Sequence, residues 1–132
     1  MNIVLGVGCD RDTSLETLEQ AIQQALLEAN VSIGNVISLA TIDKKNDETA
    51  LLALVEKNGW LVHFYTAKQL AKVKVPNPSE IVLKYMGTPA VSEAAALLAA
   101  NTDMTNIVLE KFKFCGEDSK NATVSIVRIN NG

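Results

Sequence analysis

Hydrophobic residues along the chain alternate between short β-branched runs and stripes at helical spacing. The run Asn2–Val7, which is mostly apolar and bounded by glycines, predicts a strand buried on both faces. The string TSLETLEQAIQQALLEAN that follows carries a leucine and alanine stripe with glutamates and glutamines elsewhere, which predicts an amphipathic helix. Thr13 and Glu16 have the spacing of a capping box at the start of this helix.

The order of strand and then helix is repeated along the next part of the chain. A second strand is expected over Val36–Ile42 and a third over Leu61–Tyr65. A helix from about Asp47 to Lys57 joins them, and Gly59 stands where a left-handed cap would end it. A short helix is expected after the third strand.

The alternation of strands and helices is interrupted after residue 73 by a stretch that contains prolines. Two prolines flank Asn77, so this stretch is expected to be an extended or turning connection. Ser79 can cap a short helix that ends at Gly87. Thr88 can cap a further helix, AVSEAAALLAA, whose small apolar residues predict burial or close packing on both sides.

The tail predicts two more strands, Asn106–Phe114 and Ala122–Ile129, joined as an antiparallel hairpin at or near a sheet edge. The earlier alternation predicts a mostly parallel sheet with right-handed crossovers and helices on both faces. The expected fold class is therefore α/β, a three-layer α/β/α sandwich with a C-terminal antiparallel hairpin. A length of 132 residues is near the commonest size of one domain, so a single domain over residues 1–132 is expected.

Composition and charge exclude several classes of protein. The net charge is −3, the twelve basic residues are scattered and only six residues are aromatic, so a nucleic-acid surface is not expected. No signal peptide is expected, and no apolar run approaches the about 20 residues that would span a membrane. Cys9 and Cys115 are expected to be free thiols in a reducing cytosol, unless the fold brings them together.

The loop after the first strand, Gly6–Ser14, is the first candidate site, because ligands of open α/β sheets bind beyond the carboxyl ends of strands. Its two glycines would allow a ligand to approach the backbone, and the following helix start with Arg11 could hold an anion such as a carboxylate. Its two aspartates would repel phosphate, and a plain strand-to-helix turn remains the alternative. Catalysis by Cys9 is not expected, because the thiol needs a base and only His63 is available.

The loop after the second strand, Thr41–Glu48, holds three carboxylates and two lysines. Asp43 with Asp47 or Glu48 could form an acid–base pair, since proximity would separate their pKa values. Helix capping with a solvated surface is the plain alternative.

The helix after Thr88 supplies the third candidate region. Thr88 and Ser92 offer hydroxyls at its start. Glu93 is expected to be partly exposed on the first turn, where acidic residues suit the helix dipole, and the alternative is that a specific partner holds it. His63 lies alone in a strand, which favours a structural role over metal binding, and no metal site is expected.

Three segments in this order, GVGCDRDTSLETLEQAI, LATIDKKNDETALLAL and VPNPSEIVLKYMGTPAVSEAAALLAA, resemble the successive signatures of the family of CbiG C-terminal domains and CobE proteins. The likeness extends from about Ile3 to the final strand. Lys44 and Asn46 depart from the family pattern, which would have an apolar residue and an alanine there. The family pattern falls on Gly6, Gly8, Cys9, Thr13, Thr41, Asp43, Lys45, Asp47, Glu48, Pro76, Asn77, Pro78, Ser79, Gly87, Thr88, Pro89, Glu93 and Ala94.

The resemblance implies a role in building the corrin ring of cobalamin. CbiG-type proteins hydrolyse the ring-A lactone of cobalt-precorrin-5A and release acetaldehyde, and the length of this chain fits their C-terminal domain alone. The chain is therefore expected to be a hydrolytic domain or carrier for corrinoid (precorrin) intermediates, or a noncatalytic docking domain for other pathway enzymes, with no cofactor of its own. Asp43 and Glu48 are the expected catalytic residues, and the expected ligand-binding residues are Gly6, Gly8, Cys9, Arg11, Thr13, Thr41, Lys45, Ser79, Thr88, Ser92 and Glu93.

Overall fold

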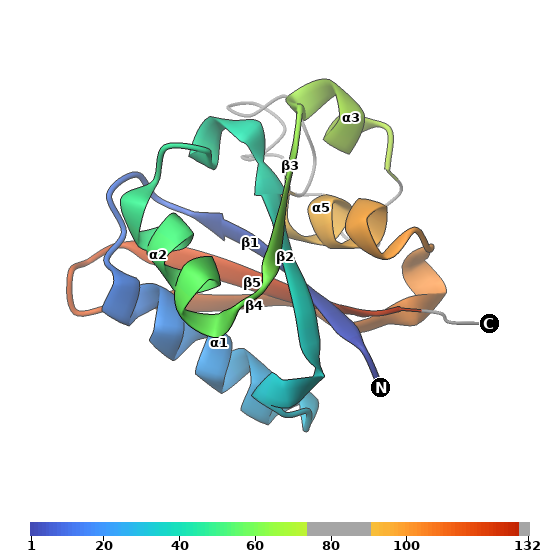
Figure 1. Ribbon diagram of the computed structural model, residues 1–132, viewed down its shortest axis with the longest axis horizontal. Helices are drawn as coiled ribbons and strands as arrows, with labels where there is room; N and C mark the ends of the chain where they lie inside the picture. Colours follow the sequence, from blue (N-terminus) through green and yellow to red (C-terminus); the bar gives the residue numbers. More distant parts are fainter. Residues whose placement is uncertain (74–90, 130–132) are drawn as a thin grey trace.

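A five-stranded sheet with the strand order β3-β2-β1-β5-β4 forms the middle layer of the protein, and helices lie on both of its faces (Figure 1). The computed structural model describes residues 1–73 and 91–129. The strands are β1 (Ile3–Cys9), β2 (Val36–Ile42), β3 (Leu61–Tyr65), β4 (Ile107–Cys115) and β5 (Asn121–Arg128), and the α-helices are α1 (Leu15–Ala29), α2 (Thr49–Asn58), α3 (Ala67–Ala71) and α5 (Val91–Ala100).

The direction of the strands confirms the predicted fold class. β2 runs parallel to both of its neighbours, β1 and β3. β5 is antiparallel to β1 and to β4, so β4 points the same way as the first three strands. The hairpin of β4 and β5 closes one side of the sheet, with β4 at the edge.

Two apolar clusters lie on opposite faces of the sheet. The first joins α1 and α2 to the sheet through buried side chains such as Leu18, Leu39 and Leu51. The second joins the alanine-rich α5 and α3 to the other face. The prediction that the alanine-rich helix would be closely packed is confirmed, because its residues Val91–Leu97 are all buried.

Helix α5 lies unusually close to β1. An added Cβ at Gly6 would lie 1.8 Å from the Ser92 carbonyl oxygen and 2.9 Å from the Ala96 Cβ. At Gly8 the nearest atom would be 3.8 Å away, on Val91. Both glycines lie within β1, which continues to Cys9, so the expectation that the loop after the strand begins at Gly6 is wrong.

The start of α1 differs from the predicted capping box. Ser14 is the N-cap, and its side chain accepts a hydrogen bond from the Thr17 N–H, whereas Thr13 donates to a main-chain carbonyl within its own loop. The carboxylate of Asp118, from the β4–β5 hairpin, accepts hydrogen bonds from the Ser14 N–H at 3.0 Å and the Thr17 hydroxyl at 2.9 Å. An acidic side chain of the protein itself therefore occupies the positive end of α1.

The element boundaries otherwise follow the sequence prediction closely. The second and third strands begin and end where predicted, and Gly59 adopts the left-handed conformation with φ 68°. α2 begins at Thr49, two residues later than expected, because Glu48 has extended backbone angles. The connection around Asn77 and the residues Ser79 and Thr88 lie outside the described residues.

The remaining general expectations concern the thiols and the membrane. Cys9 and Cys115 are both free. Within residues 1–73 and 91–129, no helix has the length and apolar character that crossing a bilayer requires.

Gly6→Ala should destabilise the protein by about 1–3 kcal/mol or more, because the new methyl group meets backbone that cannot move without displacing α5. Gly8→Ala is the matched control and should change stability little, or raise it slightly, since its Cβ has ordinary space. Urea unfolding curves of both variants measure the difference. Equal stability of the two variants would contradict the close approach of α5.

Asp118→Asn should lower the melting temperature at neutral pH. The melting temperature of this variant should also fall less than that of the unmodified protein as the pH is lowered. Hydrogen bonds from the Ser14 N–H and its neighbours lower the pKa of Asp118 from 3.8 to about 2. The ionised carboxylate therefore stabilises the fold above pH 3.8, and this contribution is lost as the pH falls toward about 2. Thermal melts between pH 7 and pH 2 measure the effect, with Glu117→Gln as the neighbouring control, and identical pH profiles would refute it.

Candidate functional site

The loops that follow β1 and β2 meet at the carboxyl edge of the sheet, as predicted from their positions after strand ends. The Arg11 guanidinium spans the two loops: Nη2 lies 2.7 Å from Asp47 Oδ2, and Nη1 lies 3.1 Å from Glu48 Oε1. The Asp12 N–H donates to the same Glu48 oxygen at 3.4 Å. One arginine thus connects two acidic side chains to the first loop.

The two carboxylates that Arg11 binds have different environments. The Asp47 side chain is 63% exposed, whereas that of Glu48 is only 6% exposed. The hydrogen bond from Arg11 lowers the pKa of Asp47. For Glu48, the guanidinium and the Asp12 N–H supply the partners that a buried carboxylate requires.

Cys9 is the last residue of β1, and Lys45 belongs to the second loop. Burial raises the pKa of the Cys9 thiol, and the charge of Lys45 opposes that effect only in part. Lys45, which was predicted to bind the ligand, is itself only 8% exposed. Cys9 is half-buried, and a protonated thiol is a poor nucleophile.

A cavity of about 610 Å³ opens between the starts of α1 and α2. One arginine and three carboxylates line it, so its charge is mainly negative. The rest of its wall consists of hydroxyls and small apolar side chains. The lining residues are Arg11, Asp12, Thr13, Ser14, Leu15, Asp47, Glu48, Thr49, Ala50 and Ala53.

Three predicted residues of the second loop, Thr41, Asp43 and Lys45, do not line this cavity. Asp43 lies in the 3₁₀ turn η2 (Asp43–Lys45) directly after β2 and is partly exposed. Thr41 is buried within β2, where its hydroxyl donates to the Val7 carbonyl at 2.6 Å. Thr41 therefore helps to hold β2 against β1.

The prediction that Glu93 would be partly exposed is wrong. Its side chain is completely buried, and Lys111 Nζ from β4 lies 3.3 Å from Glu93 Oε1. Burial raises the pKa of Glu93, while the Lys111 ammonium works against that rise. Sequence reasoning missed Lys111 because the alternating segment EKFKF is typical of a strand with its lysines in solvent.

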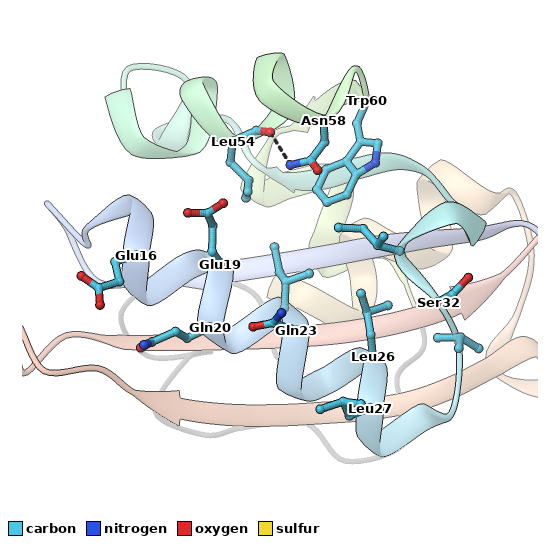
Figure 2. Close-up of a pocket in the computed structure, with 13 residues that line it drawn as sticks. Glu16, Glu19, Gln20, Gln23, Leu26, Leu27, Ser32, Leu54, Asn58 and Trp60 are labelled. Atoms are coloured by element: carbon cyan, nitrogen blue, oxygen red, sulfur yellow. Dashed lines mark hydrogen bonds between the residues drawn. The ribbon is translucent and has the colours of Figure 1, made fainter.

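A second cavity, also about 610 Å³, lies between α1 and the end of α2, and its lining does not include the two loops. Figure 2 shows Leu54 and Trp60 on one side of it and Leu26 of α1 on the other. Glu19 on its rim forms an ion pair with Lys57 at 2.8 Å. Its walls are mainly apolar, so it does not gather groups for acid–base chemistry.

His63 and the possible metal ligands are the remaining predicted features of the site. His63 lies in β3 with its ring stacked on Tyr65, the ring centroids 6.4 Å apart. In the part of the chain that the structure describes, no three His, Cys, Asp or Glu side chains lie close enough together to hold a metal ion.

Residues 3–127 match the model of the family described as cobalamin synthesis G C-terminus. The chain is 35% identical over 127 residues to the cobalt-precorrin-5A hydrolase of Priestia megaterium. This match covers 96% of this chain and 32% of the hydrolase. It is 36% identical over 108 residues to protein CobE of a Sinorhizobium species, covering 80% of this chain and 70% of CobE. The chain thus spans about a third of the length of the hydrolase that it matches.

Solved structures agree with these relatives. The crystal structure of CobE, a protein of the cobalamin biosynthetic pathway, has a TM-score of 0.78 and 27% identity, with 98% of this chain and 93% of CobE covered. The crystal structure of cobalamin biosynthesis protein chiG from Agrobacterium tumefaciens has a TM-score of 0.67 and 25% identity, with 98% and 99% covered. The motifs, the family model and the fold agree, and the chain belongs to the cobalamin synthesis G C-terminus family.

Proposed function

We propose that this domain binds a corrinoid intermediate of cobalamin biosynthesis and takes part in hydrolysis of the ring-A lactone of cobalt-precorrin-5A. The observation that carries the proposal is the 35% identity to a cobalt-precorrin-5A hydrolase over 96% of the chain. The cavity between the first two loops, at the carboxyl edge of the sheet, supports it, because this is where open α/β sheets bind ligands. A cytosolic location is part of the proposal and is supported by the two free thiols.

Hydrolysis of a lactone needs a base for the attacking water and a donor for the oxygen that develops negative charge. As water adds to the carbonyl carbon, the base takes its proton. The ring C–O bond then breaks and the departing oxygen takes a proton, which leaves an alcohol and a carboxylic acid that ionises. Acetaldehyde leaves when this alcohol gives up its proton to become a carbonyl, while its bond to the ring carbon breaks and the ring keeps the electron pair. A carboxylate is the best candidate for the base, because the single histidine is stacked on Tyr65 in β3.

Asp43 and Glu48 differ in how they suit this role. Glu48 is buried, and its Oε1 is bound by both Arg11 and the Asp12 N–H, so this oxygen is committed to holding the two loops together. Asp43 lies directly after the end of β2, outside the lining of the cavity, and its partial exposure leaves its carboxylate accessible to a ligand at the same edge of the sheet. We assign proton transfer to Asp43 and the positioning of the loops to Glu48.

A noncatalytic carrier is the second candidate function. The observation that favours it is that Asp47 and Glu48, two of the three carboxylates of the second loop, both pair with Arg11. An exposed apolar patch on the alanine-rich helix would favour a docking domain, and α5 is instead largely buried. Protection of a labile macrocycle therefore has more support than docking.

One experiment separates the two candidates. The purified domain is incubated with cobalt-precorrin-5A, and both acetaldehyde release and tight binding are measured. Turnover supports the hydrolytic role, and binding without turnover supports the carrier. If the domain shows neither binding nor turnover, both candidate functions are refuted.

Asp43→Asn should lower turnover about 100-fold or more while binding persists, because the amide cannot accept the proton of water. Glu48→Gln should reduce turnover less and should lower the melting temperature, since it weakens the contact with Arg11. Acetaldehyde assays, ligand titration and thermal melts are made on both variants. Unchanged turnover in Asp43→Asn would remove Asp43 from the mechanism.

Cys9→Ser should leave turnover and binding within about twofold of the unmodified protein, because the raised pKa keeps the thiol protonated and unreactive. The measurement is the same acetaldehyde assay with a thermal melt as a control for folding. Complete loss of turnover in a stable variant would show that the thiol takes part in the chemistry.

A further inference from the structure

Arg11 is the cation of the loop cavity. Among the described residues that line this cavity, no other arginine or lysine occurs. The Arg11 side chain is 56% exposed. The positive end of α1, which borders the same cavity, is already occupied by the Asp118 carboxylate. A ligand carboxylate that enters the cavity therefore meets Arg11 as its charged partner.

The two terminal nitrogens of the Arg11 guanidinium have different partners. Nη1 donates to the Lys44 carbonyl at 3.2 Å and lies 3.1 Å from Glu48 Oε1, and the Glu48 side chain is 6% exposed. Nη2 lies 2.7 Å from Oδ2 of Asp47, whose side chain is 63% exposed. Arg11 is thus anchored through Nη1 to backbone and to a buried carboxylate, whereas its partner at Nη2 is in contact with solvent.

The guanidinium retains hydrogen-bonding capacity on the side of Nη2. An arginine has five N–H donors in one plane. The contacts of Arg11 within the described residues involve Nη1 and Nη2 and leave Nε without a partner. Nε and Nη2 share one edge of the guanidinium, and such an edge can bind a carboxylate through two parallel hydrogen bonds. A carboxylate placed along this edge would make one hydrogen bond more than Asp47 makes.

The two ion pairs of Arg11 differ in how easily a ligand can replace them. An exposed ion pair contributes little to stability, because water screens the attraction and both side chains lose freedom. Separation of Arg11 from Glu48 would instead leave a buried carboxylate without its cation, which is strongly unfavourable. Asp47 can therefore leave Arg11 at low cost, while Glu48 stays.

The charge of the cavity also favours exchange over simple addition. Three carboxylates and one arginine line it, so a further anion would be repelled if all of these groups stayed in place. If Asp47 turns into solvent as the ligand carboxylate arrives, the number of anions around Arg11 stays the same. A corrinoid intermediate, with several acetate and propionate arms, can supply that carboxylate.

We infer that a carboxylate of the corrinoid ligand displaces Asp47 from Arg11, so that Arg11 is a binding residue and Asp47 is an internal competitor for the same guanidinium. Glu48 is a positioning residue that keeps Arg11 in place during the exchange. The inference rests on the proposed function, since it takes the ligand class from it. Competition of this kind raises specificity, because a small anion with few other contacts gains little by replacing Asp47.

The first test measures the affinity for cobalt-precorrin-5A by titration. Asp47→Asn should tighten binding about three- to fivefold, because an amide competes for Arg11 less strongly than a carboxylate. Asp12→Asn is the matched control, since it removes one negative charge from the same cavity lining. In the described part of the chain the Asp12 side chain has no hydrogen bond or ion pair with Arg11, and asparagine tolerates its φ of 62°. The effect of Asp12→Asn should stay below about twofold.

The second test asks whether the gain in affinity depends on Arg11. Arg11→Met should weaken binding about tenfold or more, and adding Asp47→Asn to it should give no gain, because there is no guanidinium left to compete for. Arg11→Met leaves Glu48 without its cation, so thermal melts accompany every titration. Arg11→Lys is the second background, because it keeps a cation beside Glu48 but lacks the planar edge that binds a carboxylate twice.

The outcomes separate this inference from the proposed function. If Asp47→Asn and Asp12→Asn change the affinity equally, or if the gain persists without Arg11, Asp47 acts by general repulsion and the inference is wrong. If Asp47→Asn weakens binding, Asp47 itself contacts the ligand, which also overturns the inference. Tight binding that is unaffected in both Arg11 variants refutes the inference alone. If the unmodified protein does not bind cobalt-precorrin-5A, the proposed function fails and this inference fails with it.

Discussion

The contact between Gly6 and the first turn of α5 is the constraint on which the α5 side of the structure depends. A Cβ at Gly6 would lie 1.8 Å from the Ser92 carbonyl oxygen, so only glycine allows the helix to lie this close to β1. The close approach buries Ser92 and Glu93 against the sheet. It also brings Glu93 to Lys111 of the edge strand, across 18 residues of sequence.

On the opposite face, charged side chains of the protein satisfy the groups that a ligand was expected to satisfy. Asp118 occupies the positive end of α1, and Arg11 joins Asp47 and Glu48. Contacts within the protein therefore hold the two loops together. A ligand that enters their cavity meets a site that is already connected and mainly negative.

Under the proposed function, a ligand with several carboxylate arms would meet this acidic cavity at the carboxyl edge of the sheet. The carboxylates of the two loops suit proton transfer near a reacting ester. The domain covers about a third of the length of the hydrolase that it matches and 70% of CobE.

Local patterns in the sequence were sufficient for the strands Val36–Ile42 and Leu61–Tyr65, the fold class and the family, because hydrophobic periodicity and turn residues act over a few neighbours. They also placed the first two loops at one edge, since parallel strands end together. The burial of Glu93, the capping of α1 by Asp118 and the commitment of Arg11 to two carboxylates depend on residues distant in the chain. Only the tertiary structure decided these, because packing and charge pairing are set by which surfaces meet, and no local pattern records that.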